Sequence, residues 1–95
     1  MAGSKVEELH KYLESESPGL SVEVGWDSDL RACSFRFDKG ASVAHLLKIS
    51  QVLLDDYAVP EIIGKLEGAR WKSVLQQAGR NPVIFTSTGF ESPAK

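Results

Sequence analysis

Two runs in which apolar and polar residues alternate constrain the fold of this chain more than any other feature. The apolar residues occupy every second position: Leu20, Val22, Val24 and Trp26 in the first run, and Cys33, Phe35 and Phe37 in the second. Such alternation is typical of strands that bury one face. The Asp27-Ser28-Asp29 segment between the runs consists of turn residues, whose short side chains bond nearby backbone N–H groups. The sequence therefore predicts an antiparallel β-hairpin.

The hydrophobic pattern also predicts a register for this hairpin. A turn centred on Ser28 and Asp29 fixes the pairs. It places apolar residues opposite one another: Leu20 with Phe37, Val22 with Phe35, and Val24 with Cys33. Trp26 would face Arg31, whose guanidinium can lie on the ring. A shift by one residue would turn the apolar side chains to solvent, so we expect this face, with Cys33 on it, to belong to the core.

Apolar residues at helical spacing predict three further regions. They are a first helix at about residues 5–15, the main core helix at about residues 43–57, and a region at residues 60–79 that contains one or two helices. Gly79 is a typical C-cap, and the chain then turns into a short β-rich run at residues 83–86.

The predicted order of elements is α-β-β-α-α-α-β. It indicates an α+β fold, in which an antiparallel sheet of about three strands packs on helices in a small two-layer domain. We expect residues 1–95 to form a single domain and residues 89–95 to form a flexible tail.

The composition indicates a folded chain without a membrane segment. Of its 95 residues, 42% are hydrophobic and 25% charged, which suffices for one core and argues against disorder. The N-terminal residues lack the apolar stretch of a signal peptide, and no apolar segment is long enough to span a bilayer. Cys33 is the sole cysteine, which is typical of a reducing compartment. We therefore expect a cytoplasmic protein.

Residues that could hold a metal or catalyse a reaction are few. His10, Cys33 and His45 lack the close spacing of zinc ligands, so we expect a core thiol and two surface histidines. Asp27 and Asp29 supply too few oxygens for a calcium loop. No nucleophile motif, phosphate-binding loop or dinucleotide fingerprint occurs in the sequence. The sequence predicts no metal site, no cofactor and no catalytic residue, and an enzyme is not expected.

Four residues are candidates for contact with a protein partner. They are Asp55, Asp56, Trp71 and Phe90. The two carboxylates stand at the end of a predicted helix, where a basic partner would offset the negative end of the dipole. That partner is either Lys65 or Arg70 of the same chain or a group on another protein. Because interfaces often contain aromatic residues, the leading hypothesis is a regulatory module that binds a protein partner or a second copy of the chain.

A basic cluster in the last third of the chain supports an alternative. It comprises Lys65, Arg70, Lys72, Gln76, Gln77 and Arg80. Arginine and glutamine can read base edges, so a nucleic-acid-associated regulator is the second hypothesis. The net charge of −2 favours the first hypothesis, because nucleic-acid binding depends on excess positive charge. A small-ligand-binding domain or a minor enzyme is the third.

Overall fold

The computed structural model describes the backbone of residues 2–91 and the side chains of residues 5–91. These residues form helices and strands in the order α-β-β-β-α-α-α-β-β. In sequence they are α1 (Ala2–Ser15), β1 (Ser21–Asp27), β2 (Ala32–Lys39), β3 (Ser42–Ser50), α2 (Gln51–Asp56), α3 (Val59–Gly68), α4 (Trp71–Ala78), β4 (Pro82–Thr86) and β5 (Gly89–Glu91).

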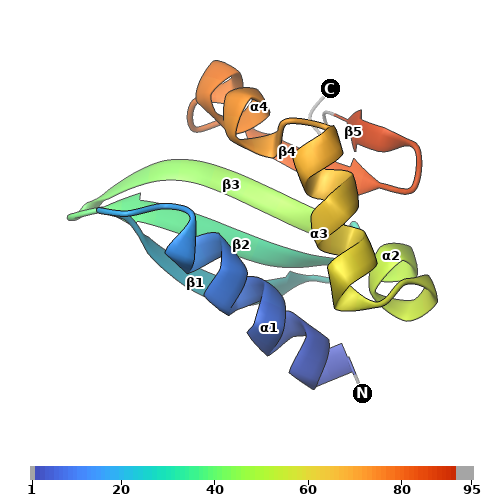
Figure 1. Cartoon of the computed structure of the whole chain (residues 1–95). Coiled ribbons are helices and arrows are strands. Elements are labelled where there is room, and N and C mark those ends of the chain that lie inside the picture. The colour runs from blue at the N-terminus through green and yellow to red at the C-terminus, as the bar shows by residue number, and fades with distance from the viewer. Residues whose placement is uncertain (1, 92–95) are drawn as a thin grey trace.

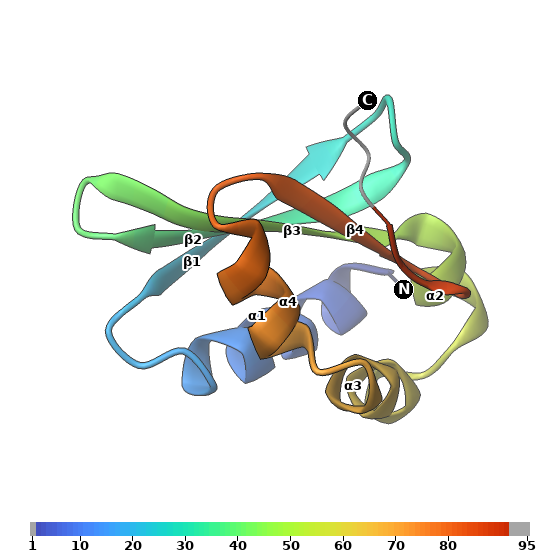
Figure 2. The ribbon, with the colours of Figure 1, turned by 90° about the horizontal axis from the view of Figure 1, so that it is seen from above.

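The strands form one sheet in the order β1-β2-β3-β4-β5 (Figure 1). Helices α1, α3 and α4 cover one face of the sheet, and α2 lies at its end (Figure 2). Neighbouring strands are antiparallel except β3 and β4, which are parallel. The segment from α2 to α4 provides the long crossover that a parallel pair requires. The α+β class is confirmed, but the expected sheet of about three antiparallel strands is wrong, because β3 and β5 enlarge it to five strands.

The β1–β2 hairpin forms with its predicted faces and with a register that differs by two residues. The observed pairs on the helix side are Val22–Phe37, Val24–Phe35 and Trp26–Cys33. A shift by two positions keeps each side chain on its predicted face. Phe35 and Phe37 are both fully buried, as the alternation predicts.

A four-residue turn causes this difference in register. Oδ1 of Asp27 accepts hydrogen bonds from the N–H groups of Asp29 (3.0 Å) and Leu30 (3.1 Å). The bond from Leu30 is the main reason that the pKa of Asp27 lies below its usual range. Arg31 completes the turn in a left-handed conformation, with a φ of 51°. Asp27 therefore pairs with Ala32, and the four residues between them form the turn.

The predicted main core helix at residues 43–57 is wrong. Its first half is strand β3, and only Gln51–Asp56 is helical. Leu47 and Ile49 of β3 lie opposite apolar residues of β2 and are fully buried. Pairing with β2 outweighs the helical periodicity, because a short run of leucine and β-branched residues fits a buried strand as well as a helix.

Residues 60–79 contain two helices rather than one. Helices α3 and α4 are separated at Arg70, whose left-handed φ of 57° interrupts the helical path. Gly79 is the C-cap of α4, as predicted, and its φ of 61° suits a residue without a side chain.

The predicted flexible tail at residues 89–95 is wrong for Gly89–Glu91, which forms strand β5 beside β4. The rings of Phe85 and Phe90 pack together there, with centroids 4.7 Å apart. This aromatic contact anchors the short strand. The rest of the predicted tail, residues 92–95, lies outside the described residues.

The core lies between the sheet and the helices. Its largest fully buried side chains come from both layers: Leu9, Leu13, Phe35, Phe37, Leu47, Ile49, Leu53, Ile62 and Leu66. Cys33 is also buried, and burial raises the pKa of its thiol to about 11.

The helices also bear on membrane insertion. None of the helices within residues 2–91 has the length and apolar character that crossing a membrane requires.

Candidate functional site

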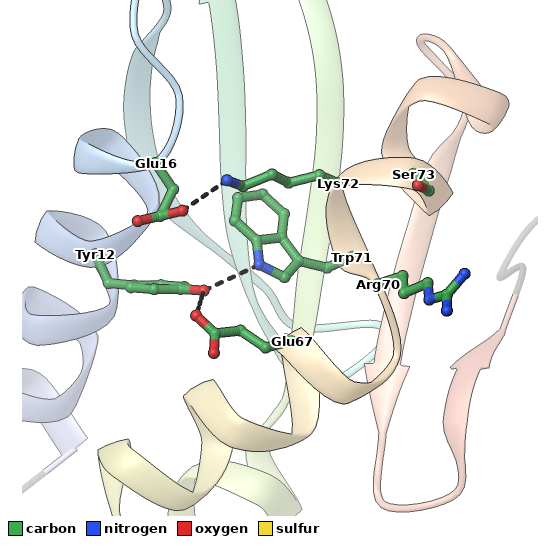
Figure 3. A pocket seen from close by; sticks show the side chains of 7 residues that line it. All are labelled: Tyr12, Glu16, Glu67, Arg70, Trp71, Lys72 and Ser73. Carbon is green, nitrogen blue, oxygen red and sulfur yellow. Dashed lines mark hydrogen bonds and ion pairs between the residues drawn. The ribbon is translucent and has the colours of Figure 1, made fainter.

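A cavity of about 280 Å³ lies where α1 faces the junction between α3 and α4. We call it the Tyr12 cavity (Figure 3). Its lining comes from these three helices, the turn that follows α1, and the junction: Tyr12, Glu16, Glu67, Arg70, Trp71, Lys72 and Ser73. The left-handed turn at Arg70 starts α4 in a direction that brings Trp71 and Lys72 towards α1.

A chain of hydrogen bonds crosses the Tyr12 cavity. Nε1–H of Trp71 donates to Oη of Tyr12 (3.1 Å), and that hydroxyl donates to Oε2 of Glu67 (2.8 Å). Burial is the main cause that raises the pKa of Tyr12 to about 12, and the Glu67 carboxylate raises it further. The phenol therefore remains protonated near neutral pH and acts here as a hydrogen-bonding link between two helices.

Two charged groups of the Tyr12 cavity, Lys72 and Glu16, form an ion pair. Nζ of Lys72 lies 2.6 Å from Oε1 of Glu16 and 5.7 Å from the centroid of the Trp71 ring. The Trp71 side chain is only 2% exposed, and its ring packs against those of Tyr12 and Phe37. Trp71, a predicted interaction residue, is thus a core residue that closes the floor of the cavity.

The other predicted nucleic-acid contacts are distributed over α3, α4 and the turn that follows. Arg70 and Lys72 share the Tyr12 cavity with two glutamates. Lys65 lies over the ring of Tyr57, 4.6 Å from its centroid. The remaining three residues are exposed: Gln76, Gln77 and Arg80. The structure therefore places part of the basic cluster beside acidic side chains.

Asp55 and Asp56 are exposed at the end of α2. Within residues 5–91, neither carboxylate forms an ion pair with Lys65 or Arg70. The basic group at this helix end comes from α1 instead. Nζ of Lys5 donates to the carbonyl oxygens of Leu54 (2.5 Å) and Tyr57 (3.0 Å).

The two histidines are half-buried rather than the surface residues that we expected, and each contacts a backbone carbonyl. Nε2 of His10 lies 2.6 Å from the carbonyl oxygen of Val22, and Nδ1 of His45 lies 3.1 Å from that of Gly79. Within the described residues, no three His, Cys, Asp or Glu side chains lie close enough together to hold a metal ion.

The sequence analysis missed a second candidate site, the outer edge of β1. Val24 is 44% exposed and Trp26 is 54% exposed, although both lie on the face of β1 that Val22 uses to enter the core. Figure 2 shows the reason: towards their connecting turn, β1 and β2 diverge from the helix layer. The twist of the sheet thus leaves this end of β1 uncovered by any helix within residues 2–91.

The backbone of β1 is also open at this end. The carbonyl of Val22 bonds His10 of α1, so it points away from β2, whereas the carbonyl of Gly25 accepts a hydrogen bond from Sγ of Cys33 on β2 (3.6 Å). Because backbone groups alternate in direction along a strand, the N–H and C=O groups of Val24 and Trp26 also point outward. Within residues 2–91, no strand pairs with this side of β1. We call the outward groups and side chains of Val24 and Trp26 the open edge.

Comparisons with known proteins add no family to this description. No protein-family model, curated protein or solved structure matches the chain.

Proposed function

We propose that this chain is a small protein-interaction module that binds an extended segment of a partner protein along the open edge. One observation carries the proposal: at Val24 and Trp26, exposed apolar side chains coincide with a strand edge that no other strand within residues 2–91 covers. A strand added there would bond the backbone groups, and its alternate side chains would cover the valine and the tryptophan. Uncovered edges of this kind promote aggregation, so a natural occupant is expected.

The Tyr12 cavity supports a function less well, because most of its polar groups bond one another: Trp71 with Tyr12, Tyr12 with Glu67, and Lys72 with Glu16. Tyr12 keeps its proton near neutral pH and so is poorly suited to act as a base. Glu16 and Glu67 reduce the attraction of Arg70 and Lys72 for a phosphate group. These contacts favour a structural role for the cavity, and we propose neither an enzymatic nor a nucleic-acid-binding role for it.

The interaction surface in this proposal differs from the candidates in the sequence. Trp71 is buried, and Phe90 is half-buried against Phe85. Asp55 and Asp56 remain accessible and are secondary candidates. The lone buried thiol of Cys33 supports a reducing, cytoplasmic location for the module.

A peptide selection tests the proposed function. Wild-type protein is screened against a displayed library of random peptides. The affinity of each enriched peptide is then measured for wild type and for the Val24→Pro and Val52→Ala variants. Proline at Val24 removes an outward N–H without breaking the β1–β2 ladder, so the fold should persist. Val52 is the control position, because it is a valine on α2, away from the open edge, and is exposed to a similar extent (54%).

We expect peptides with alternating apolar residues, whose affinity falls at least about tenfold on Val24→Pro and is unchanged on Val52→Ala. A selection without enriched peptides, or peptides that bind Val24→Pro as well as wild type, would contradict the proposal. Circular dichroism of the Val24→Pro variant verifies that any loss of binding does not reflect unfolding.

A further inference from the structure

We infer that the strand received by the open edge is β1 of a second copy, paired antiparallel about a twofold axis that passes beside Gly25. This inference rests on the proposed function and names its partner. A twofold axis applies each contact twice, so a suitable edge must be complementary to itself. The open edge meets this condition best in the register centred on Gly25.

The extent of the open edge limits the possible registers. His10 of α1 already bonds the outward carbonyl of Val22, which marks the covered end of β1. The open groups are those of Val24 and Trp26, and Gly25 lies midway between them. Centring the axis on Gly25 places Val24 opposite Trp26 of the second copy, and Trp26 opposite Val24 of the second copy. Four outward backbone groups on each strand then find partners in the other.

The side chains support the same register on the helix side of the sheet. Each exposed valine would lie opposite an exposed tryptophan, and pairs of aromatic and β-branched residues are favourable across strands. Both of the large apolar side chains that β1 exposes would thus be covered by one symmetric contact. An axis at Val24 would instead place Trp26 opposite Val22, which is already buried beneath α1.

The opposite face of the sheet accommodates the contact. Two Gly25 residues would face each other, where no side chains obstruct the approach. Glu23 would lie opposite Asp27 of the second copy, and each carboxylate already pairs with a cation on its own chain, although Arg36 is shared with Asp38. Arg36 lies 2.9 Å from Glu23, and Lys48 lies 3.2 Å from Asp27. An axis at Glu23 would set two glutamates directly opposite each other, with the arginines alone to offset them.

The first test is the oligomeric state of the whole chain, measured by size exclusion with light scattering from micromolar to millimolar concentration. We expect wild type to shift from monomer to dimer, since one strand pair makes a small interface. Val24→Lys should remain monomeric because it inserts a charge into the contact. Val52→Lys, which adds the same charge to another exposed valine, should dimerise like wild type.

The second test reads the register from disulfide formation in Gly25→Cys, Val24→Cys and Glu23→Cys. A Cβ atom at Gly25 has no neighbour within 4 Å, so the cysteine fits. Directly opposite residues, such as the two Gly25, lie close enough for a disulfide. The two Val24 residues would be offset by two positions across the pair, about 7–8 Å apart, and the two Glu23 residues by four positions, farther still, so both pairs are too distant. We expect Gly25→Cys to cross-link at least about tenfold faster than the other two variants. Native Cys33 is buried in all three.

The outcomes separate this inference from the proposed function. A wild type that stays monomeric at millimolar concentration, or faster cross-linking of Val24→Cys or Glu23→Cys, would overturn the pairing at Gly25. If the dimer fails but peptides still bind in a Val24-dependent way, the proposed peptide-binding function stands and only the identity of the partner is wrong. If peptide binding fails as well, both proposals are wrong. A dimer unaffected by Val24→Lys would place the contact elsewhere and would also overturn the inference.

Discussion

Trp71 and Trp26 lie in two regions of contrasting structure. Trp71 is 2% exposed between the helix layer and the sheet, and its indole N–H bonds Tyr12. Trp26 is 54% exposed on edge strand β1, at the end where this strand diverges from the helix layer. The difference shows that in a small two-layer fold the environment of an aromatic residue depends on which helix extends over it. One tryptophan supports the core, and the other is available for binding.

The largest expected effect is on stability and separates the two regions directly. Trp71→Ala should lower the free energy of unfolding by about 3–5 kcal/mol, because it leaves a cavity in the core. Trp26→Ala should change it by no more than about 0.5 kcal/mol, as for other exposed positions. Urea unfolding of the dilute monomer measures both values. Similar losses for the two variants would contradict the assignment of one tryptophan to the core and the other to the surface.

A smaller effect is expected at Tyr12, which joins Trp71 to Glu67. Tyr12→Phe should cost about 1–2 kcal/mol at neutral pH, since the buried indole N–H loses its acceptor. The wild-type pKa is raised to about 12 in the folded state, so the folded protein holds this proton more tightly than the unfolded chain. Its contribution to stability is complete below pH 10 and is lost as the pH rises towards 12.

The difference in stability between wild type and Tyr12→Phe should therefore shrink from pH 10 to pH 12. Ionisation of Cys33 also destabilises the fold at alkaline pH, because burial raises the pKa of its thiol as well. This effect is equal in wild type and Tyr12→Phe, so it cancels in their difference. Urea titrations at matched alkaline pH values provide the measurement. A difference that stays constant over this range would show that the tyrosine is not held as a protonated link.

Local patterns in the sequence predict the elements whose signals are local. Alternation predicted the hairpin and its faces, and Gly79 marked the end of a helix. The register of the hairpin could not be predicted, because it depends on the left-handed conformation of Arg31, a residue type that rarely adopts it. Strand β3 was missed because Leu47 and Ile49 fit a helix as well as a strand until β2 lies beside them.

The candidate site depended on contacts between residues distant in the sequence. Lys5 supplies the positive charge at the negative end of the α2 helix dipole. It lies on α1, 49 residues before Leu54, whose carbonyl it bonds, and no local pattern in the sequence indicates this contact. The open edge was missed for a related reason. Trp26 continues the same alternation as Val22, and only the twist of the sheet exposes one and buries the other. Composition and spacing do not encode that difference.

Amide hydrogen exchange along β1 tests the central claim most directly, because the claim concerns the direction of individual N–H groups. In the dilute monomer, the amides of Val24 and Trp26 should exchange rapidly, while those of Glu23 and Gly25, which point towards β2, should be protected. At millimolar concentration all four should become protected as the second copy covers the edge. Protection of Val24 and Trp26 in the dilute monomer would show that the edge is not open. Rapid exchange at both concentrations would show that no second copy binds there.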